Sequence, residues 1–208
     1  DALLVATAGD NNVAIGATAG DACTTATNNV AVGFNSMGAT TTGSSNVAIG
    51  ANALAATTDA TNNVAIGKGA LLVQVAATGN TVVGTTAMDA NTTGANNVAV
   101  GLDALGANTV GVRNVAVGAT AAVANTTGTD NIAIGATALD ANTTGVENMA
   151  IGVAALGANT LGDSNVAIGA RAHDANTTGV ENIAIGTDAL GAVTLGTWNI
   201  AIGDTAGN

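Results

Sequence analysis

Residues 131–147 read NIAIGATALDANTTGVE, and close copies of this 17-residue unit fill the chain. An Asn followed by an apolar trio and Gly recurs twelve times, from Asn12 to Asn199, with no insertion or deletion between copies. A fixed period of this kind is typical of a solenoid, in which each repeat forms one coil and stacks on the next. We number coil positions from this Asn, so that Asn131 is position 1 and Glu147 is position 17.

Each coil carries a strand signal and two turn signals. Positions 2 to 4 alternate branched apolar residues with Ala, as in Ile132, Ala133 and Ile134, which predicts a β-strand. Positions 5 and 15, here Gly135 and Gly145, predict turns, because a residue without Cβ can take positive φ. Positions 8 to 13 predict a second, shorter extended stretch. We therefore expect an all-β fold, a parallel β-solenoid or β-roll, with neighbouring coils about 4.8 Å apart.

The repeat covers the whole chain, which predicts a single repeat domain at 1–208 of about twelve 17-residue coils, with a partial coil at each end. The first residue is Asp1, without a Met or signal peptide, and we expect the chain to be a segment of a longer fibre. Charged residues make up 8% and aromatic residues 1% of the chain, so the core must be thin and built from small residues. The net charge of −11 leaves no basic surface for nucleic acid, and no apolar run is long enough for a membrane span.

Charged residues avoid the strand and its flanks. Every Asp, Glu, Lys and Arg lies at position 6, 7, 10, 14, 16 or 17. Since side chains alternate between the faces of a strand, we expect positions 2 and 4 to point inward and positions 1, 3 and 5 outward. An outward face without charge in twelve copies predicts that other copies of the chain cover it, so the functional unit would be an oligomer. The predicted oligomer face consists of Ala14, Ala31, Ala48, Ala65, Ala99, Ala116, Ala133, Ala150, Ala167, Ala184 and Ala201.

The Asn column at position 1 predicts a structural amide ladder, in which each side chain bonds to its copy one coil away. Such a ladder satisfies polar groups that are costly to bury, and an Asn array that binds a ligand is the alternative. The Thr column at position 13 predicts a second internal ladder, with a water-ordering, ice-binding face as its alternative. The predicted ladder residues are Asn12, Asn29, Asn46, Asn63, Asn80, Asn97, Asn114, Asn131, Asn148, Asn165, Asn182 and Asn199.

Four single residues depart from the repeat without forming a catalytic set. His173 replaces Leu at position 9, and we interpret it as a tolerated substitution at a coil edge, since the chain has no other His to partner it. Cys23 is expected to be a small buried or half-buried residue. Phe34 and Trp198 lie at charge-tolerant positions and should be exposed. Without catalytic or calcium-binding motifs, we expect no enzyme, no catalytic residue, no cofactor and no metal site.

The NVAIG unit, followed three residues later by a small Ala (or Ser36), resembles the head repeat of YadA-like trimeric autotransporter adhesins. The ANTTG half is similar to NTAIGxxALxxNTTG repeats of marine bacterial and phage fibre proteins. The resemblance implies a left-handed β-roll assembled as a homotrimer, with the Ala stripe, for example Ala133 and Ala150, toward the trimer axis or a neighbouring chain. The chain departs from the adhesin pattern in its longer coil, in Asn where the family tends to have Ser, and in lacking a stalk, neck or anchor.

Together these features predict a structural and adhesive fibre segment for attachment to a cell or other surface, located outside the cell on a cell surface or virion. A bacterial adhesin and a phage tail fibre are both open. The expected partners are copies of the same chain, as a homotrimer or stacked end to end, and an unidentified surface receptor. The alternatives are an ice-binding solenoid and a self-assembling extracellular filament subunit.

Overall fold

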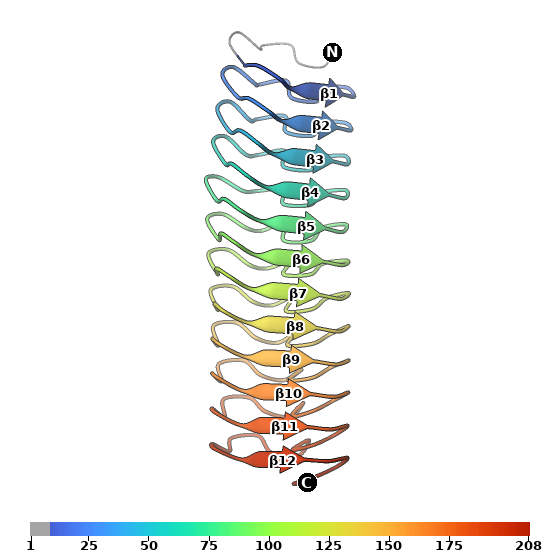
Figure 1. The fold of residues 1–208 in the computed structure, drawn as a ribbon, viewed down its shortest axis with the longest axis vertical. Helices are drawn as coiled ribbons and strands as arrows, with labels where there is room; N and C mark the ends of the chain where they lie inside the picture. Colours follow the sequence, from blue (N-terminus) through green and yellow to red (C-terminus); the bar gives the residue numbers. More distant parts are fainter. Residues whose placement is uncertain (1–8) are drawn as a thin grey trace.

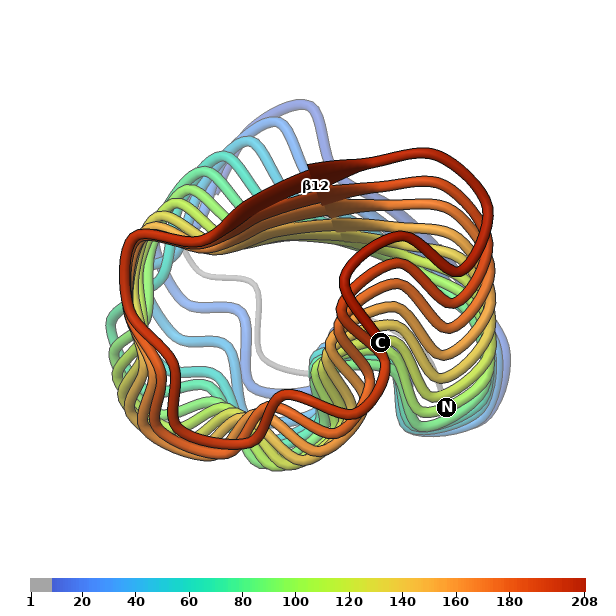
Figure 2. The same cartoon turned by 90° about the horizontal axis from the view of Figure 1, so that it is seen from below.

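The computed structural model describes residues 9–208, which form a rod of stacked coils that twists slightly about its long axis (Figures 1 and 2). Each coil contributes one three-residue strand, and residues 1–8 of the partial coil predicted before Asn12 lie outside the described residues. The strands are β1 (Val13–Ile15), β2 (Val30–Val32), β3 (Val47–Ile49), β4 (Val64–Ile66), β5 (Thr81–Val83), β6 (Val98–Val100), β7 (Val115–Val117), β8 (Ile132–Ile134), β9 (Met149–Ile151), β10 (Val166–Ile168), β11 (Ile183–Ile185) and β12 (Ile200–Ile202).

The twelve strands form one parallel sheet in sequence order, β1 to β12. Each residue pairs with its copy 17 positions later, as Ile132 pairs with Met149 and Ala133 with Ala150. The prediction of an all-β parallel solenoid with this period is therefore confirmed. The twelve strands are joined by eleven complete coils, which at about 4.8 Å each give a sheet about 53 Å long.

The second extended stretch predicted in each coil is not a strand. Positions 5 to 11 are turns, because positions 7 and 9 both take the left-handed conformation, with φ of 53° at Thr137 and 54° at Leu139. Position 17 is left-handed as well, with φ of 58° at Glu147. Three such bends close the path around the axis, so the rest of the coil is a series of tight turns (Figure 2).

The two Gly columns have different physical reasons. Gly135, at position 5, has φ of 132°, and a Cβ there would lie 2.5 Å from the carbonyl oxygen of Gly152 in the next coil. Position 5 is therefore the predicted positive-φ turn. Gly145, at position 15, is not among the residues with positive φ, but its Cβ would lie 2.4 Å from Asn142 Oδ1 and 2.5 Å from Gly162 O. Close approach of the position 12 Asn and of the next coil, rather than the backbone angle, therefore favours Gly at position 15 in the coils that carry this Asn.

The strand faces are reversed relative to the prediction, since the Ala column at position 3 points into the core. The side chains of Asn131, Leu139 and Asn142 are also buried inside the same coil, so the narrow interior has room for only a methyl group at position 3. Branched residues at positions 2 and 4 point outward instead. The predicted oligomer face is thus the core of the chain itself: Ala14 is partly buried against it, and Ala31, Ala48, Ala65, Ala99, Ala116, Ala133, Ala150, Ala167, Ala184 and Ala201 are buried in it.

Candidate interaction face

The outer face of the sheet carries two columns of large apolar side chains, at positions 2 and 4, which we call the Val/Ile face. Most of these side chains are half-buried along the rod, with an exposed fraction that reaches 38% at Ile134 in the middle and 59% at Ile15 near one end. Thr81 and Met149 are the two exceptions to Val or Ile. The Val/Ile face consists of Val13, Ile15, Val30, Val32, Val47, Ile49, Val64, Ile66, Thr81, Val83, Val98, Val100, Val115, Val117, Ile132, Ile134, Met149, Ile151, Val166, Ile168, Ile183, Ile185, Ile200 and Ile202.

The Val/Ile face is large, continuous and uncharged. Three residues of strand by eleven strand spacings give a strip about 10 Å by 53 Å, or roughly 500 Å² in projection, and the corrugated side-chain surface is larger. No Asp, Glu, Lys or Arg occurs at positions 1 to 5 in any coil. Monomeric proteins rarely expose contiguous apolar patches of more than a few hundred Å². The face therefore has the character of a surface that another molecule covers.

The two borders of the Val/Ile face differ. At position 6, directly after the Gly turn, the border is mixed: Phe34, Leu102 and Val153 have exposed fractions of 59%, 52% and 58%, and two other coils carry Lys68 and Asp204. At position 17, directly before the Asn, the column becomes charged in the C-terminal half, with Arg113, Asp130, Glu147 and Glu181. An apolar centre with a polar rim is the usual anatomy of a protein–protein interface.

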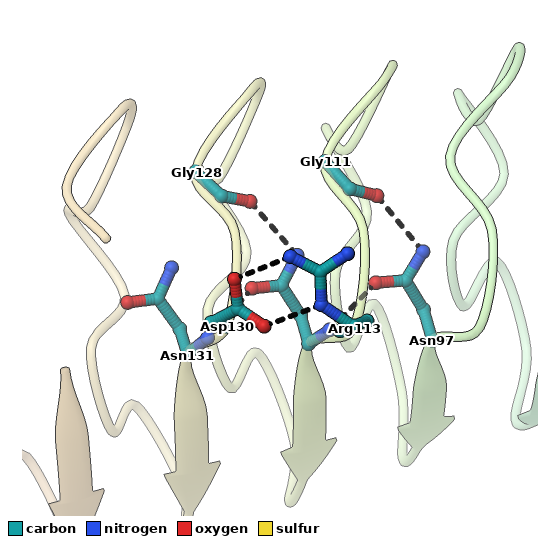
Figure 3. Close-up of polar contacts among 7 residues, drawn as sticks. Asn97, Gly111, Arg113, Gly128, Asp130 and Asn131 are labelled. Atoms are coloured by element: carbon teal, nitrogen blue, oxygen red, sulfur yellow. Dashed lines mark hydrogen bonds and ion pairs between the residues drawn. The ribbon is translucent and has the colours of Figure 1, made fainter. Parts of the chain in front are cut away.

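Within residues 9–208 two ion pairs join adjacent coils, one at position 17 and one at position 7. The guanidinium of Arg113 donates from Nε and Nη2 to the two carboxylate oxygens of Asp130, at 2.6 Å each (Figure 3). Arg171 and Asp188 form the same two-bond pair at position 7, also at 2.6 Å. Hydrogen bonding to the guanidinium lowers the pKa of both aspartates. These pairs are exposed to solvent and contribute little to stability, but they align the surface of one coil with the next.

The Asn column at position 1 is a buried, hydrogen-bonded ladder. Asn97 Oδ1 accepts the backbone N–H of Asn114 in the next coil at 2.8 Å, and Asn97 Nδ2 donates to the carbonyl of Gly111 at 2.9 Å (Figure 3). Several coils add a direct amide–amide bond, such as Asn165 Nδ2 to Asn148 Oδ1 at 3.1 Å. Since both ends of the amide bond to the chain itself and the side chains are buried, this column offers no surface for a ligand.

A second Asn column, at position 12, runs beside the first and was not predicted as a ladder. Asn125 Nδ2 donates to Asn108 Oδ1 at 2.9 Å and to Gly128 O at 3.1 Å. The sequence contains a signal for it, because Asn at position 12 always occurs with Gly at position 15. Any residue with a Cβ at position 15 would collide with the amide oxygen of this Asn. The second column comprises Asn91, Asn108, Asn125, Asn142, Asn159 and Asn176, whereas Cys23, Thr57 and Gln74 at position 12 occur with Ala26, Ala60 and Ala77 at position 15.

The Thr column at position 13 bonds inward to the backbone. Thr126 Oγ1 donates to the carbonyl of Thr143 at 3.0 Å, and Thr143 Oγ1 donates to Thr160 O at 3.1 Å. The hydroxyl protons of these side chains are thus used within the solenoid, as the internal-ladder interpretation requires. Position 14, with Thr127 and Thr144, is the exposed column of this half of the coil.

Of the four residues that depart from the repeat, three lie where the sequence predicts. Cys23 is buried, and desolvation raises the pKa of its thiol. Phe34 and Trp198 are exposed, and the Trp198 indole N–H donates to the Glu181 carboxylate. His173 differs from the prediction, since it lies fully buried in the core rather than at a coil edge.

Within residues 9–208 there is no pocket, and no group of three or more His, Cys, Asp or Glu side chains is placed to hold a metal ion. The same part of the chain contains no helix long and apolar enough to cross a membrane. Comparison of the chain with protein-family models, with curated proteins and with solved structures gives no match in any of the three.

Proposed function

We propose that this chain is a structural and adhesive segment of a fibre on the outside of a cell or virion. The observation that carries the proposal is the rod itself: twelve strands in constant register, with one continuous apolar face along the whole length of the sheet. A solenoid gains stability coil by coil and provides length without a hinge. The location outside the cell rests on the resemblance of the repeats to those of surface fibres.

We further propose that copies of this chain associate through the Val/Ile face. Two copies present the same strand spacing along the same length, so their side chains can interdigitate over the whole face. The projected area of the strip is roughly 500 Å², against roughly 800 Å² per partner in a standard interface, and the corrugated side chains and the position 6 residues add to it. A homotrimer is the assembly that the resemblance implies, and the Val/Ile face then takes the place that the sequence interpretation gave to the Ala stripe.

The adhesive part of the proposal rests on repetition of the remaining surface. In the six coils that span Ala90 to Thr178, position 11 is always Ala, position 13 is always Thr, and position 14 is Thr in four coils. Many identical weak contacts along one rigid rod bind a repetitive surface more tightly than any single contact does. The receptor is therefore expected to be an extended or repetitive surface rather than a small molecule.

Two measurements test these parts separately. Negative-stain electron microscopy should show straight rods of uniform length, at least as long as the 53 Å sheet and wider than one coil; flexible or irregular particles would contradict the fibre segment. Latex beads coated with the protein should adhere to a cultured cell layer more than albumin-coated beads do. Equal adhesion of the two kinds of bead would contradict the adhesive part of the proposal and leave the segment the role of a spacer.

A further inference from the structure

His173 occupies a core position that the coils on either side fill with Leu. The flanking residues at position 9 are Leu156 and Leu190, and the exposed fraction of the His173 side chain is 0%. His173 N–H donates to Ala189 O at 2.8 Å, and Leu156 N–H donates to Ala172 O at 3.0 Å. The main chain at Ala172 and His173 is therefore bonded to the coils on both sides, which holds the imidazole inside the stack.

The hydrogen bonds of the ring define its protonation state. Nδ1 lies 3.2 Å from the carbonyl oxygen of Leu190, which can only accept, so Nδ1 carries the proton of the neutral ring. Nε2 is buried and has no hydrogen-bond partner. A second proton on Nε2 would place an unpaired N–H and a positive charge in an apolar core, which is costly.

The surroundings of the ring offer little compensation for a charge. The preceding coil has no ionisable residue anywhere in 149–158. In the following coil, Asp188 is already bonded to Arg171 at the surface. Desolvation is the largest effect and lowers the pKa of His173, although the bond to the Leu190 carbonyl and the charge of Asp174, the next residue, act in the opposite direction.

We propose that His173 makes its coil, residues 165–181, an acid-sensitive opening point in the rod. When the imidazole binds a second proton it leaves the core, and this coil separates from its neighbours while the coils farther away stay folded. A Leu at the same position has no such response. The inference does not depend on the proposed fibre function.

The direction and size of the effect follow from proton linkage. The ordinary His pKa is 6.5, and the folded state lowers it, so the neutral ring favours the closed coil above that value. Stability is then lost as the pH falls below about 6.5 toward the lowered pKa of the folded state. Between pH 7.5 and pH 5.5 one such group increases the open population by up to about tenfold, the limit set by the ordinary pKa.

Hydrogen–deuterium exchange of the full chain at pH 7.5 and 5.5, corrected for the intrinsic exchange rate, tests this. We expect protection of the Leu156, His173 and Asn176 amides to fall in acid by several-fold, up to about tenfold, with little change around β3 and β6. His173→Leu, which restores the residue of the flanking coils, should abolish the difference. Leu139→His, a matched transplant, should create a second acid-sensitive coil at 131–147.

Two outcomes would overturn the proposal. One is an equal loss of protection along all coils between the two pH values. The other is the same local loss in His173→Leu as in the wild type. Since Leu is the residue of the neighbouring coils, this variant is expected to fold, and its circular dichroism at pH 7.5 verifies that.

Discussion

At the scale of the residue, the coil balances backbone strain against burial. Leu139 is fully buried and yet left-handed, with φ of 54°. The left-handed conformation costs a non-Gly residue roughly 1–2 kcal/mol, whereas burying a Leu side chain gains about 1.5–3 kcal/mol. Burial therefore outweighs the strain, and the column at position 9 keeps Leu or Met in most coils although Gly would fit the backbone better.

At Gly135 a larger side chain would gain no burial that offsets the strain, because the backbone angle and the next coil alone determine which residue fits. Replacing it with Ala would put a Cβ 2.5 Å from Gly152 O at a φ of 132°. We expect Gly135→Ala to lower the free energy of unfolding, measured by denaturant unfolding, by about 1–3 kcal/mol or more. Ala136→Gly, at the exposed next position, is the matched control and should change stability by less than about 1 kcal/mol. Similar losses in the two variants would contradict this account of the turn.

The residue scale also shows which parts of the fold could be predicted. The period, the strand and the position 5 turn could be predicted, because Gly and branched residues have strong backbone preferences. The left-handed conformation of Thr137 and Leu139 could not be predicted, since neither residue type favours it. The inward and outward faces were predictable in principle: Asn131 and Ala133 share one face, so a buried Asn ladder already requires a buried Ala. Placing the bulkiest apolar residues inside led to the wrong assignment.

At the scale of the element, each coil is held to the next by strand pairing and by two Asn ladders. In Asn131→Ala, the backbone N–H of Asn148 loses its acceptor, which lies 3.0 Å away in the wild type. An unpaired buried donor costs roughly 1–3 kcal/mol, so we expect a loss of that size in thermal or denaturant unfolding. Thr144→Ala, at the exposed position 14, is the control. If both variants unfold at the wild-type midpoint, the ladder is not a stabilising element.

Asp140 gives a pH-dependent prediction at the same scale. Desolvation raises its pKa above the ordinary value of 3.8, so the folded coil disfavours the carboxylate. Its contribution to stability is therefore fully present below pH 3.8 and is lost as the pH rises through the raised pKa. Asp140→Asn should be more stable than the wild type at pH 7, and the difference should shrink toward pH 3. Melting temperatures that differ by a constant amount at both pH values would refute this explanation.

At the scale of the whole molecule, the absence of charge from positions 1 to 5 has two separate causes. Positions 1 and 3 line the core of the chain, and position 5 is a tight turn, so none of them tolerates a charged side chain. Positions 2 and 4 face outward, and nothing within the chain excludes charge there. Self-association therefore stays a prediction, but its location on the Ala stripe is wrong because these residues are buried, and the Val/Ile face takes its place in the proposal.

Substitutions on the Val/Ile face should separate assembly from folding. Ile132→Thr, Ile134→Thr and Ile151→Thr together replace outward apolar groups with a residue that also favours strands. We expect the combined variant to dissociate at concentrations where the wild type is associated, with little change in circular dichroism. Val110→Thr with Leu161→Thr, which removes exposed apolar side chains from position 14, is the matched control and should leave the association unchanged.

Sedimentation equilibrium of the unmodified chain tests the central claim most directly. If the Val/Ile face is covered by copies of the same chain, the measured mass should be an integral multiple of the 19.5 kDa chain, about threefold for the proposed homotrimer, over a range of concentrations. Circular dichroism of the same sample establishes that the β structure is intact. A single species of 19.5 kDa with intact β structure would contradict the account.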